Sequence, residues 1–245
     1  MLRGCWIVTQ RELAGYFATP LAYIFLVVFL GLTGFVTFEL GNFYHRNQAD
    51  LVPFFSYHPW LYLFLVPAIA MRVWAEERRT GSIELLLTLP LSLRDIVLGK
   101  FLAAWLFVGL ALLLTFPVWC TVNYLGSPDN GMIVAGYLGS WLMSGAFLSI
   151  GCCVSATTRN QVVAFVLSVA VCFFLVIIGM PPVLQSLTNV LPTAGVDLLA
   201  SVSLLDHFDA ISKGVLDVRD VIFYVWFIVC CLLASALVIE QKKAQ

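Results

Sequence analysis

The stretch MIVAGYLGSWLMSGAFLSIGCCVS, residues 132–155, decides the fold, because it carries no charged side chain over a length that can cross a lipid bilayer. A spanning helix needs about 20 mostly apolar residues, since each adds about 1.5 Å and the hydrocarbon layer is about 30 Å thick. Small residues recur along this stretch in two stripes: Gly136, Ser140 and Ser144, and Gly145, Ser149 and Cys153. Small side chains let membrane helices approach closely, so we expect residues 132–155 to form the core helix of a bundle.

Five further apolar stretches complete a prediction of six transmembrane helices. They are residues 21–40, 53–73, 101–125, 162–179 and 221–239. Hydrophobic residues make up 61% of the 245 residues and charged residues 11%, whereas roughly 45–50% and 25% are usual in soluble domains. We therefore expect an all-α integral membrane protein with a single domain, residues 1–245. The first stretch is too long for the apolar segment of a cleavable signal peptide, so we expect it to be retained.

Two regions outside the spans are predicted to form shorter helices. Residues 3–19 mix apolar and polar side chains as an amphipathic helix at the cytoplasmic interface does, and Pro20 ends it; a disordered tail is the alternative. Residues 180–220 are interrupted by Pro192 and three aspartates, so we expect two short external helices there rather than a seventh span. The second would carry an apolar gate over the exit, formed by Leu198, Val202, Leu205 and Phe208. A polar lid without membrane contact is the alternative.

The Lys and Arg residues predict the orientation, because they gather on the cytoplasmic side of membrane proteins. If both termini and the loops after the second and fourth spans share one side, that side holds ten basic residues. These are Arg3, Arg11, Arg72, Arg78, Arg79, Arg94, Lys100, Arg159, Lys242 and Lys243. The opposite side keeps only Arg46, Lys213 and Arg219. We therefore expect both termini to be cytoplasmic.

Several classes of function are disfavoured by the residues present. Ion-coupled transporters and intramembrane enzymes need ionisable groups within their spans, and none lies at mid-depth here. The balance of 13 Lys and Arg against 14 Asp and Glu disfavours a nucleic-acid partner. The seven cysteines lie in or beside apolar helices and are expected to pack rather than bind metal. His45, His58 and His207 are expected to be solvated residues of outer segments.

The chain has no phosphate-binding loop of the form GxxxxGK[ST]. Gly99 and Lys100 come nearest, but Arg94 stands where the first glycine is needed and Phe101 follows the lysine. We therefore expect no ATP hydrolysis, no other enzymatic activity and no cofactor in this chain, so any energy has to come from a partner.

One cytoplasmic segment is unusually detailed: AEERRTGSIELLLTLPLSLRDIVLGK, residues 75–100. Thr80, Gly81 and Ser82 predict a turn and a cap that open a short helix over residues 83–89, which Pro90 ends. Ser92 and Asp95 form a capping-box pattern for a second helix that continues into the third span. The leucines between these signals are an apolar surface on a cytoplasmic loop, which favours docking of a soluble partner. The alternative is that they lie on the membrane interface.

These residues resemble the permease subunits of type-2 ABC exporters. The resemblance rests on Glu76, Glu77, Arg78, Thr80, Gly81, Glu84, Leu85, Leu86, Pro90 and Lys100, and on the order of an interfacial helix, six spans and a long outer segment. Within the family, residues 203–224 resemble most the permeases of the gliding-motility type and relatives such as nitrous-oxide-reductase maturation permeases.

The resemblance implies how the chain is powered and where it resides. It implies a coupling helix that docks on a separate ABC ATPase, which binds ATP and Mg, through Glu76, Glu77, Arg78, Thr80, Gly81, Glu84, Leu85, Leu86 and Leu87. It also implies pairing with a second copy or a related permease in a bacterial cytoplasmic membrane, in contact with lipid. The family does not name the cargo.

Two functions of other classes compete with transport. A membrane acyl or glycosyl transferase would need a surface constellation, and the candidate cluster is Asp197, Asp206, His207 and Asp209. A non-transporting assembly or mechanotransmission subunit could use the same ATPase-driven fold to pull on a periplasmic or envelope partner. Copurification with an ATPase would remove the enzyme, and cargo movement in vesicles would decide between the other two.

Overall fold

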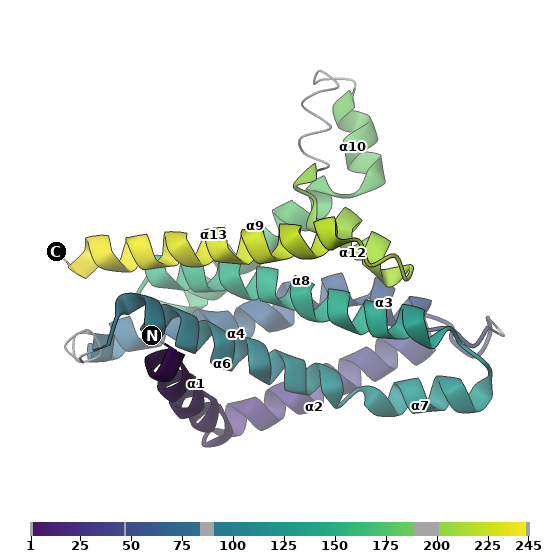
Figure 1. The fold of residues 1–245 in the computed structure, drawn as a ribbon, viewed down its shortest axis with the longest axis horizontal. Helices are drawn as coiled ribbons and strands as arrows, with labels where there is room; N and C mark the ends of the chain where they lie inside the picture. The colour runs from purple at the N-terminus through teal and green to yellow at the C-terminus, as the bar shows by residue number, and fades with distance from the viewer. Residues whose placement is uncertain (1, 47, 84–90, 189–200, 244–245) are drawn as a thin grey trace.

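The computed structural model describes residues 2–46, 48–83, 91–188 and 201–243, which form a bundle of helices without a strand among them (Figure 1). The helices in chain order are α1 (Leu2–Phe17), α2 (Pro20–Phe35) with the π-helical turn η1 (Val36–Leu40), α3 (Val52–Ser56), α4 (His58–Thr80), α6 (Leu93–Leu113), α7 (Phe116–Leu125), α8 (Asn130–Thr157), α9 (Gln161–Ile178), α10 (Pro181–Thr188), α12 (Leu204–Ser212) and α13 (Val218–Lys243). The long helices run along the long axis of the molecule, and α1 and the C-terminus lie toward the same end (Figure 1).

Five segments among the described residues are long and apolar enough to cross a membrane. They are Pro20–Leu40, Leu93–Leu125, Asn130–Thr157, Gln161–Ile178 and Val218–Gln241, and each contains most or all of a predicted span. The predicted second span, residues 53–73, is divided between α3 and α4. Although α4 has 23 residues, it is not among the five: it begins with His58 and Pro59 and ends in charged residues. The integral membrane fold is confirmed, and the number of six spans stays a prediction.

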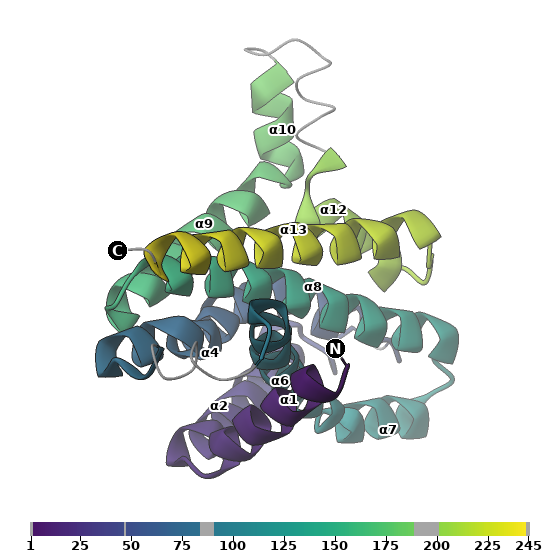
Figure 2. The same ribbon diagram turned by 60° about the vertical axis from the view of Figure 1, so that its left-hand side comes forward.

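Helix α8 is the core of the bundle, as its two stripes of small residues predict. The apolar window of α8 is 72% buried, against 22–44% in the other four segments, so α8 is the one surrounded by protein. It contacts α4, α6, α9, α12 and α13. Figure 2 shows α8 between α13 on one side and α4 and α6 on the other.

Polar contacts join α8 to its neighbours at several levels. The Ser155 hydroxyl accepts hydrogen bonds from the backbone N–H groups of Trp74 and Ala75 in α4, at 3.2 and 3.0 Å. Trp105 of α6 stacks on Trp141 of α8 with ring centroids 4.2 Å apart, and its Nε1 donates to the Trp141 carbonyl at 2.9 Å. Apolar side chains gain little from meeting each other in lipid, so such bonds matter to helix association there.

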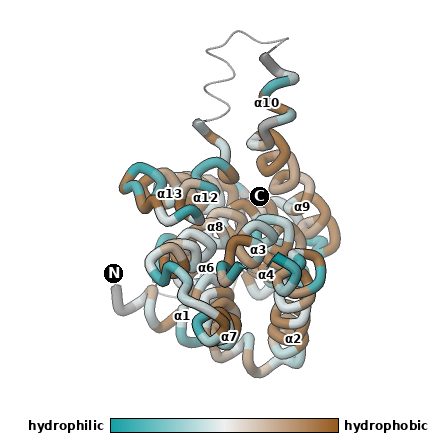
Figure 3. The backbone as a smooth tube through the Cα atoms, turned by 90° about the vertical axis from the view of Figure 1, so that its right-hand side faces the viewer, coloured by the Kyte–Doolittle hydropathy of each residue, from teal (hydrophilic) through white to brown (hydrophobic). Residues whose placement is uncertain are grey.

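The outer surfaces of α2, α9 and α13 are apolar. Val27 of α2 is 71% exposed, Phe174 of α9 is 67% exposed and Trp226 of α13 is 62% exposed, which in water would be unfavourable but suits contact with lipid. The tube view coloured by hydropathy shows α2 and α9 largely brown at the periphery (Figure 3).

A proline inside a span lacks a backbone donor and is expected to kink or interrupt the helix, but Pro67 and Pro117 behave differently. Pro117 lies in the first turn of α7, and the third predicted span is interrupted between Leu113 and Phe116. Helix α4 continues through Pro67 without a break. The expected interruption therefore occurs in the third span, where a new helix can start with proline in its first turn.

His58 does not lie in a solvated segment, so that expectation is wrong. Its side chain is fully buried at the start of α4. The ring lies edge-on to Phe54 at 4.4 Å between centroids, and Phe55 and Tyr62 complete an aromatic box. Residues 52–56 form the short helix α3 directly before α4, and His58 is buried at their junction, inside the bundle.

Candidate functional site

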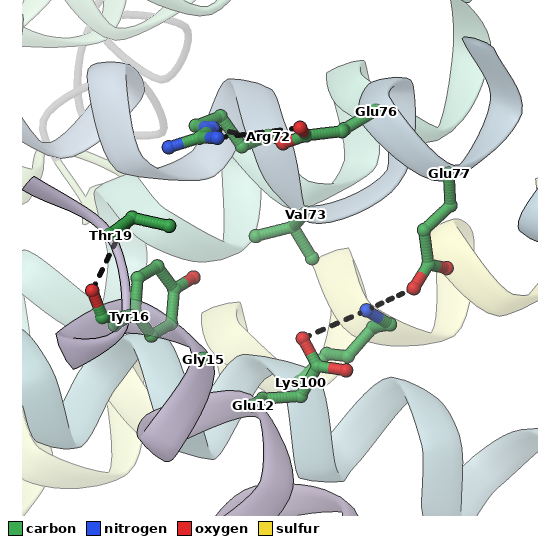
Figure 4. A pocket seen from close by; sticks show the side chains of 9 residues that line it. All are labelled: Glu12, Gly15, Tyr16, Thr19, Arg72, Val73, Glu76, Glu77 and Lys100. Carbon is green, nitrogen blue, oxygen red and sulfur yellow. Dashed lines mark hydrogen bonds and ion pairs between the residues drawn. The ribbon is translucent and has the colours of Figure 1, made fainter. Parts of the chain in front are cut away.

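The candidate site is the junction at which α1, α4 and α6 meet, beside both ends of the segment 81–92. Lys100 of α6 is its centre: the side chain is 3% exposed, although it carries a charge. Its Nζ lies 3.1 Å from Glu12 Oε2 of α1 and 2.6 Å from Glu77 Oε1 of α4 (Figure 4). The same ammonium lies 5.6 Å from the centroid of the Trp74 ring. One buried cation therefore connects three helices.

Helices α1 and α6 can form this junction because their backbones approach closely. A Cβ atom on Gly99 would lie 2.7 Å from the Val8 Cβ and 2.9 Å from the Cys5 carbonyl oxygen, so only glycine fits. The Thr9 hydroxyl lies 2.9 Å from the Cys5 carbonyl and 3.2 Å from the Gly99 carbonyl and donates to both. The amphipathic N-terminal helix predicted from the sequence is present, and its Val8 and Thr9 are buried against α6.

The pKa values of the two carboxylates that bind Lys100 are shifted in opposite directions. Burial disfavours the charged form of Glu12, but Lys100 and then Arg11 outweigh this and hold the pKa of Glu12 below its usual value. Burial raises the pKa of Glu77, and Lys100 offsets this only in part while Glu12 adds repulsion. Glu77 Oε2 is buried and has no hydrogen-bond partner among the described residues. Arg11 also binds Glu12, at 2.6 Å, so among the described residues Glu12 has two basic partners in ion pairs and Glu77 has one.

A cavity of about 280 Å³ lies beside this ion triad. Its walls come from α1, the turn that follows it, α4 and α6: Glu12, Gly15, Tyr16, Thr19, Arg72, Val73, Glu76, Glu77 and Lys100. Arg72 donates to Glu76 at 2.9 Å across one helical turn of α4 (Figure 4). The ion triad and the Arg72–Glu76 pair both line this cavity, so its walls are strongly charged.

Both ends of the segment 81–92 have fixed local structure. Gly81 ends α4 in the left-handed conformation, with φ of 75°, which side chains disfavour. The Thr80 hydroxyl donates to the Glu76 carbonyl at 3.0 Å. At the other end Ser92 accepts from the Asp95 N–H at 3.1 Å, and its hydroxyl donates to Asp95 Oδ2 at 2.6 Å. The N-cap predicted at Ser92 is confirmed, with the Asp95 carboxylate bound to the Ser92 hydroxyl rather than to its backbone N–H, and α6 begins directly after it.

The predicted docking residues divide into two groups. Glu76, Glu77, Thr80 and Gly81 lie in the last turns of α4 and its cap, where Glu76 and Glu77 are bound to Arg72 and Lys100 of the same chain. Arg78 has a buried Nε without a partner among the described residues, and burial and then Arg159 lower its pKa. Glu84, Leu85, Leu86 and Leu87 lie outside the described residues. Docking on an ATPase stays a prediction for the whole set.

The predicted external gate is only partly as expected. Phe208 is fully buried in α12, whereas Val202 precedes that helix and is 48% exposed. Leu205 is half-buried, and Leu198 lies outside the described residues. The apolar face of α12 is instead formed by Leu204, Phe208 and Ile211, because the Ser203 hydroxyl caps the helix by accepting from the Asp206 N–H. A gating role stays a prediction.

The sequence pattern contained Glu77 and Lys100 but did not predict that they meet, and it missed Glu12. A signal was available: a lone lysine at the start of an apolar helix needs a counter-ion, and Glu12 is the carboxylate of the amphipathic helix. Of the candidate transferase cluster, His207 binds Asp220, and Asp197 lies outside the described residues, so the cluster stays a prediction.

The fold and the junction define a class of protein: a multi-pass helical membrane protein whose N-terminal helix is joined by a buried ion triad to α4 and α6. The chain belongs to the ABC-2 family of transporter proteins, whose family model matches residues 61–239. It is accordingly a membrane permease of an ABC transporter.

One curated relative has a sequence that can be aligned with a part of the chain. It is heme exporter protein B of Paracoccus denitrificans (strain Pd 1222), which is 40% identical over 67 residues. These residues are 27% of this chain, and the chain spans only 31% of the relative. The assignment to the family thus rests on the match over residues 61–239. The resemblance to the gliding-motility subfamily stays a prediction.

Proposed function

We propose that this chain is the membrane-spanning half of an ATP-driven exporter, that two copies or two related permeases line one pathway, and that a separate ATPase subunit drives them. The observation that supports this best is the Lys100 junction. It ties α1, α4 and α6 together directly behind the segment 81–92, through contacts of 2.6 and 3.1 Å. A soluble partner that pushes on that segment would move three helices together.

The chemistry of ATP hydrolysis belongs to the partner in this proposal. ATP and Mg would be bound by the ATPase, and this chain would act by conformational change and not as an enzyme. The Gly81 cap and the Ser92 N-cap fix where the segment leaves α4 and enters α6. Rigid ends of this kind let a displacement reach the helices rather than be absorbed by unwinding.

The proposed place of the chain is a bacterial cytoplasmic membrane, with both termini and the segment 81–92 in the cytoplasm. The basic residues support this orientation. Heme is the first cargo to test, because the related protein is named a heme exporter.

The test is whether an acidic side chain in the segment 81–92 separates the permease from its ATPase. Leu86→Asp would place a charge in an apolar interface, at a cost of several kcal/mol, so copurification of the ATPase should be lost. Membrane insertion and the amount of permease should stay unchanged. The readout is the ATPase recovered per permease after affinity purification from membranes.

Leu216→Asp is the matched control, because Leu216 is 47% exposed in the turn before α13, on the side predicted to be external. It should leave the complex intact. If Leu86→Asp gives a normal complex, the leucines lie on lipid and the docking proposal fails. If the complex forms and hydrolyses ATP but vesicles accumulate no cargo, the chain is a mechanotransmission subunit and not an exporter.

A further inference from the structure

His207 of α12 is held between two groups that can only accept hydrogen bonds. Its Nδ1 lies 2.6 Å from Oδ1 of Asp220, in the first turn of α13, and its Nε2 lies 3.2 Å from the carbonyl oxygen of Ser201. A neutral imidazole has one N–H and can donate only once. With an ionised Asp220, both contacts form together only if both ring nitrogens carry protons. The arrangement is therefore one that a doubly protonated imidazole satisfies at both nitrogens and a neutral imidazole satisfies at only one.

The pair is the polar part of a larger contact between α12 and α13. The His207 ring stacks on Phe223 with centroids 4.0 Å apart and an angle of 24° between the rings. The Tyr224 hydroxyl donates to the Leu204 carbonyl at 2.6 Å. The side chains of His207 and Asp220 are 22% and 11% exposed, so the contact is largely shielded while protons can still reach the imidazole.

The charged groups around the pair are few. On α12 they are Asp206, Asp209 and Lys213, and beside it at the start of α13 they are Asp217 and Arg219. Burial, with repulsion from Asp206, raises the pKa of Asp209 against the opposing charge of Lys213. Helices α3, α8 and α9, which also pack on α12, carry no Asp, Glu, Lys or Arg. Imidazole is the one side-chain type in this group that ordinarily titrates between about pH 5 and 8.

We propose that His207 and Asp220 form a proton-operated latch that holds α12 against α13 when His207 is protonated. When His207 loses one proton, the ring can donate only one of its two hydrogen bonds, and the donor of that bond is then a neutral ring rather than a cation. The attachment of α12 is then reduced to the ring stack and the Tyr224 bond. The sign follows from the charge: the latch is closed at low pH and opens as the pH rises. If the orientation proposed above is correct, it responds to the pH on the external side.

Hydrogen exchange of the full-length permease in lipid nanodiscs tests the latch. Exchange of the amides of Leu204–Ser212, corrected for intrinsic rates, is compared at about pH 5.5 and pH 8. Protection of wild-type α12 should fall by roughly tenfold or more at the higher pH, as loss of a charge-assisted hydrogen bond implies. The amides of α8 serve as the internal control and should show no such step.

Two variants separate the latch from a merely structural contact. His207→Gln keeps a donor but does not titrate, so protection of α12 should be lower and independent of pH. Asp220→Asn keeps an acceptor without the charge and should shrink the step. A flat wild-type profile, or the same step in His207→Gln, would overturn the latch.

A direct measurement covers the case in which a variant fails to fold. The ¹⁵N chemical shifts of the wild-type His207 ring should report two protonated nitrogens at about pH 5.5, and a neutral ring there would also overturn the proposal. None of these results depends on an ATPase. The latch can therefore fail while the exporter proposal stands, and the reverse is also possible.

Discussion

Lys100 shows how one residue can determine the arrangement of several helices. A buried ammonium needs anionic partners, and here these come from α1 and α4. The side chain is 3% exposed, so water cannot replace a lost partner. The position of α1 is thus set by charge as well as by the close approach of its backbone at Gly99.

Replacing Lys100 by methionine should lower the free energy of unfolding by more than the loss of the lysine's own packing contacts would. The change leaves Glu12 and Glu77 facing each other without a cation, and breaking a buried ion pair from one side costs about 3–5 kcal/mol. Thermal unfolding of the purified permease should show a clear decrease in Tm. Combining Lys100→Met with Glu12→Gln and Glu77→Gln should recover most of the loss.

Lys213→Met is the matched control, since Lys213 is an exposed lysine at the end of α12. Its effect should stay within about 0.5 kcal/mol, as for most surface substitutions. Equal Tm values for the Lys100 and Lys213 variants would show that the junction contributes nothing to stability.

The single residues that the sequence failed to place are those whose environment comes from distant segments. His58 looked like a solvated residue because nothing near it in sequence shows that α3 turns it into the aromatic box. Glu12 and Lys100 are 88 positions apart, and only the packing of α1 on α6 brings them together. Apolar content predicts burial in a span, but it does not predict which polar residue will be buried with a partner.

At the scale of elements, two helix caps of different kinds bound the segment 81–92, and each is a local device. Gly81 ends α4 through a left-handed conformation, and Ser92 starts α6 through a side-chain cap. Neither device requires a contact with the rest of the molecule. The direction in which the segment leaves the bundle is therefore set locally.

Gly81→Ala should weaken both α4 and the complex with the ATPase. A residue with a Cβ atom in the left-handed region costs roughly 1–2 kcal/mol, and relief of that strain would redirect the segment. The expected result is a lower Tm and less ATPase recovered with the permease. Gly81→Asn is the control, because asparagine tolerates this conformation better. If alanine and asparagine behave alike, backbone conformation at Gly81 does not matter for docking.

The elements were largely predictable because their signals are local. The N-cap at Ser92, the break near Pro117 and the small-residue faces of α8 can all be recognised in short windows. The register of α12 was the exception. Helical spacing pointed to Val202 as part of the apolar face, but Ser203 caps the helix and so leaves Val202 outside it. Because α12 begins after Ser203, only Leu205 and Phe208 of the predicted face lie within it.

At the scale of the whole molecule, the orientation in the membrane is decided by basic residues at the helix ends. Arg72, Arg78 and Arg79 lie in the C-terminal part of α4, and Lys100 lies in the N-terminal part of α6, where its ion pair with Glu12 brings α1 alongside. Arg46 and Lys213 lie in connections between helices, and Arg219 lies in the first turn of α13. An uneven distribution of this kind determines topology during insertion.

Cysteines at Ser82 and Val202 should react from opposite sides of the membrane. The background must lack the seven native cysteines, because Cys120 and Cys230 are exposed. Ser203 is unsuitable as the outer position, since it is 1% exposed and caps α12. A membrane-impermeant thiol reagent added to intact cells should label Val202→Cys alone, and Ser82→Cys should react only after the membrane is opened. Labelling of both from the same side would refute the orientation.

The unequal lengths of α9 and α13 have a consequence for the lipid around the molecule. The 18 residues of α9 span about 27 Å and the 26 residues of α13 about 39 Å. Helix α9 is thus shorter, and α13 longer, than the thickness of a hydrocarbon layer of about 30 Å. Charged residues lie near both ends of α13, among them Asp220 and Glu240, so these ends can extend into the headgroup layers, whereas a bilayer thicker than α9 has to become thinner beside it. That adjustment carries a modest energy for each ångström of mismatch, so the acyl-chain length of the membrane becomes a variable that acts on this protein through α9.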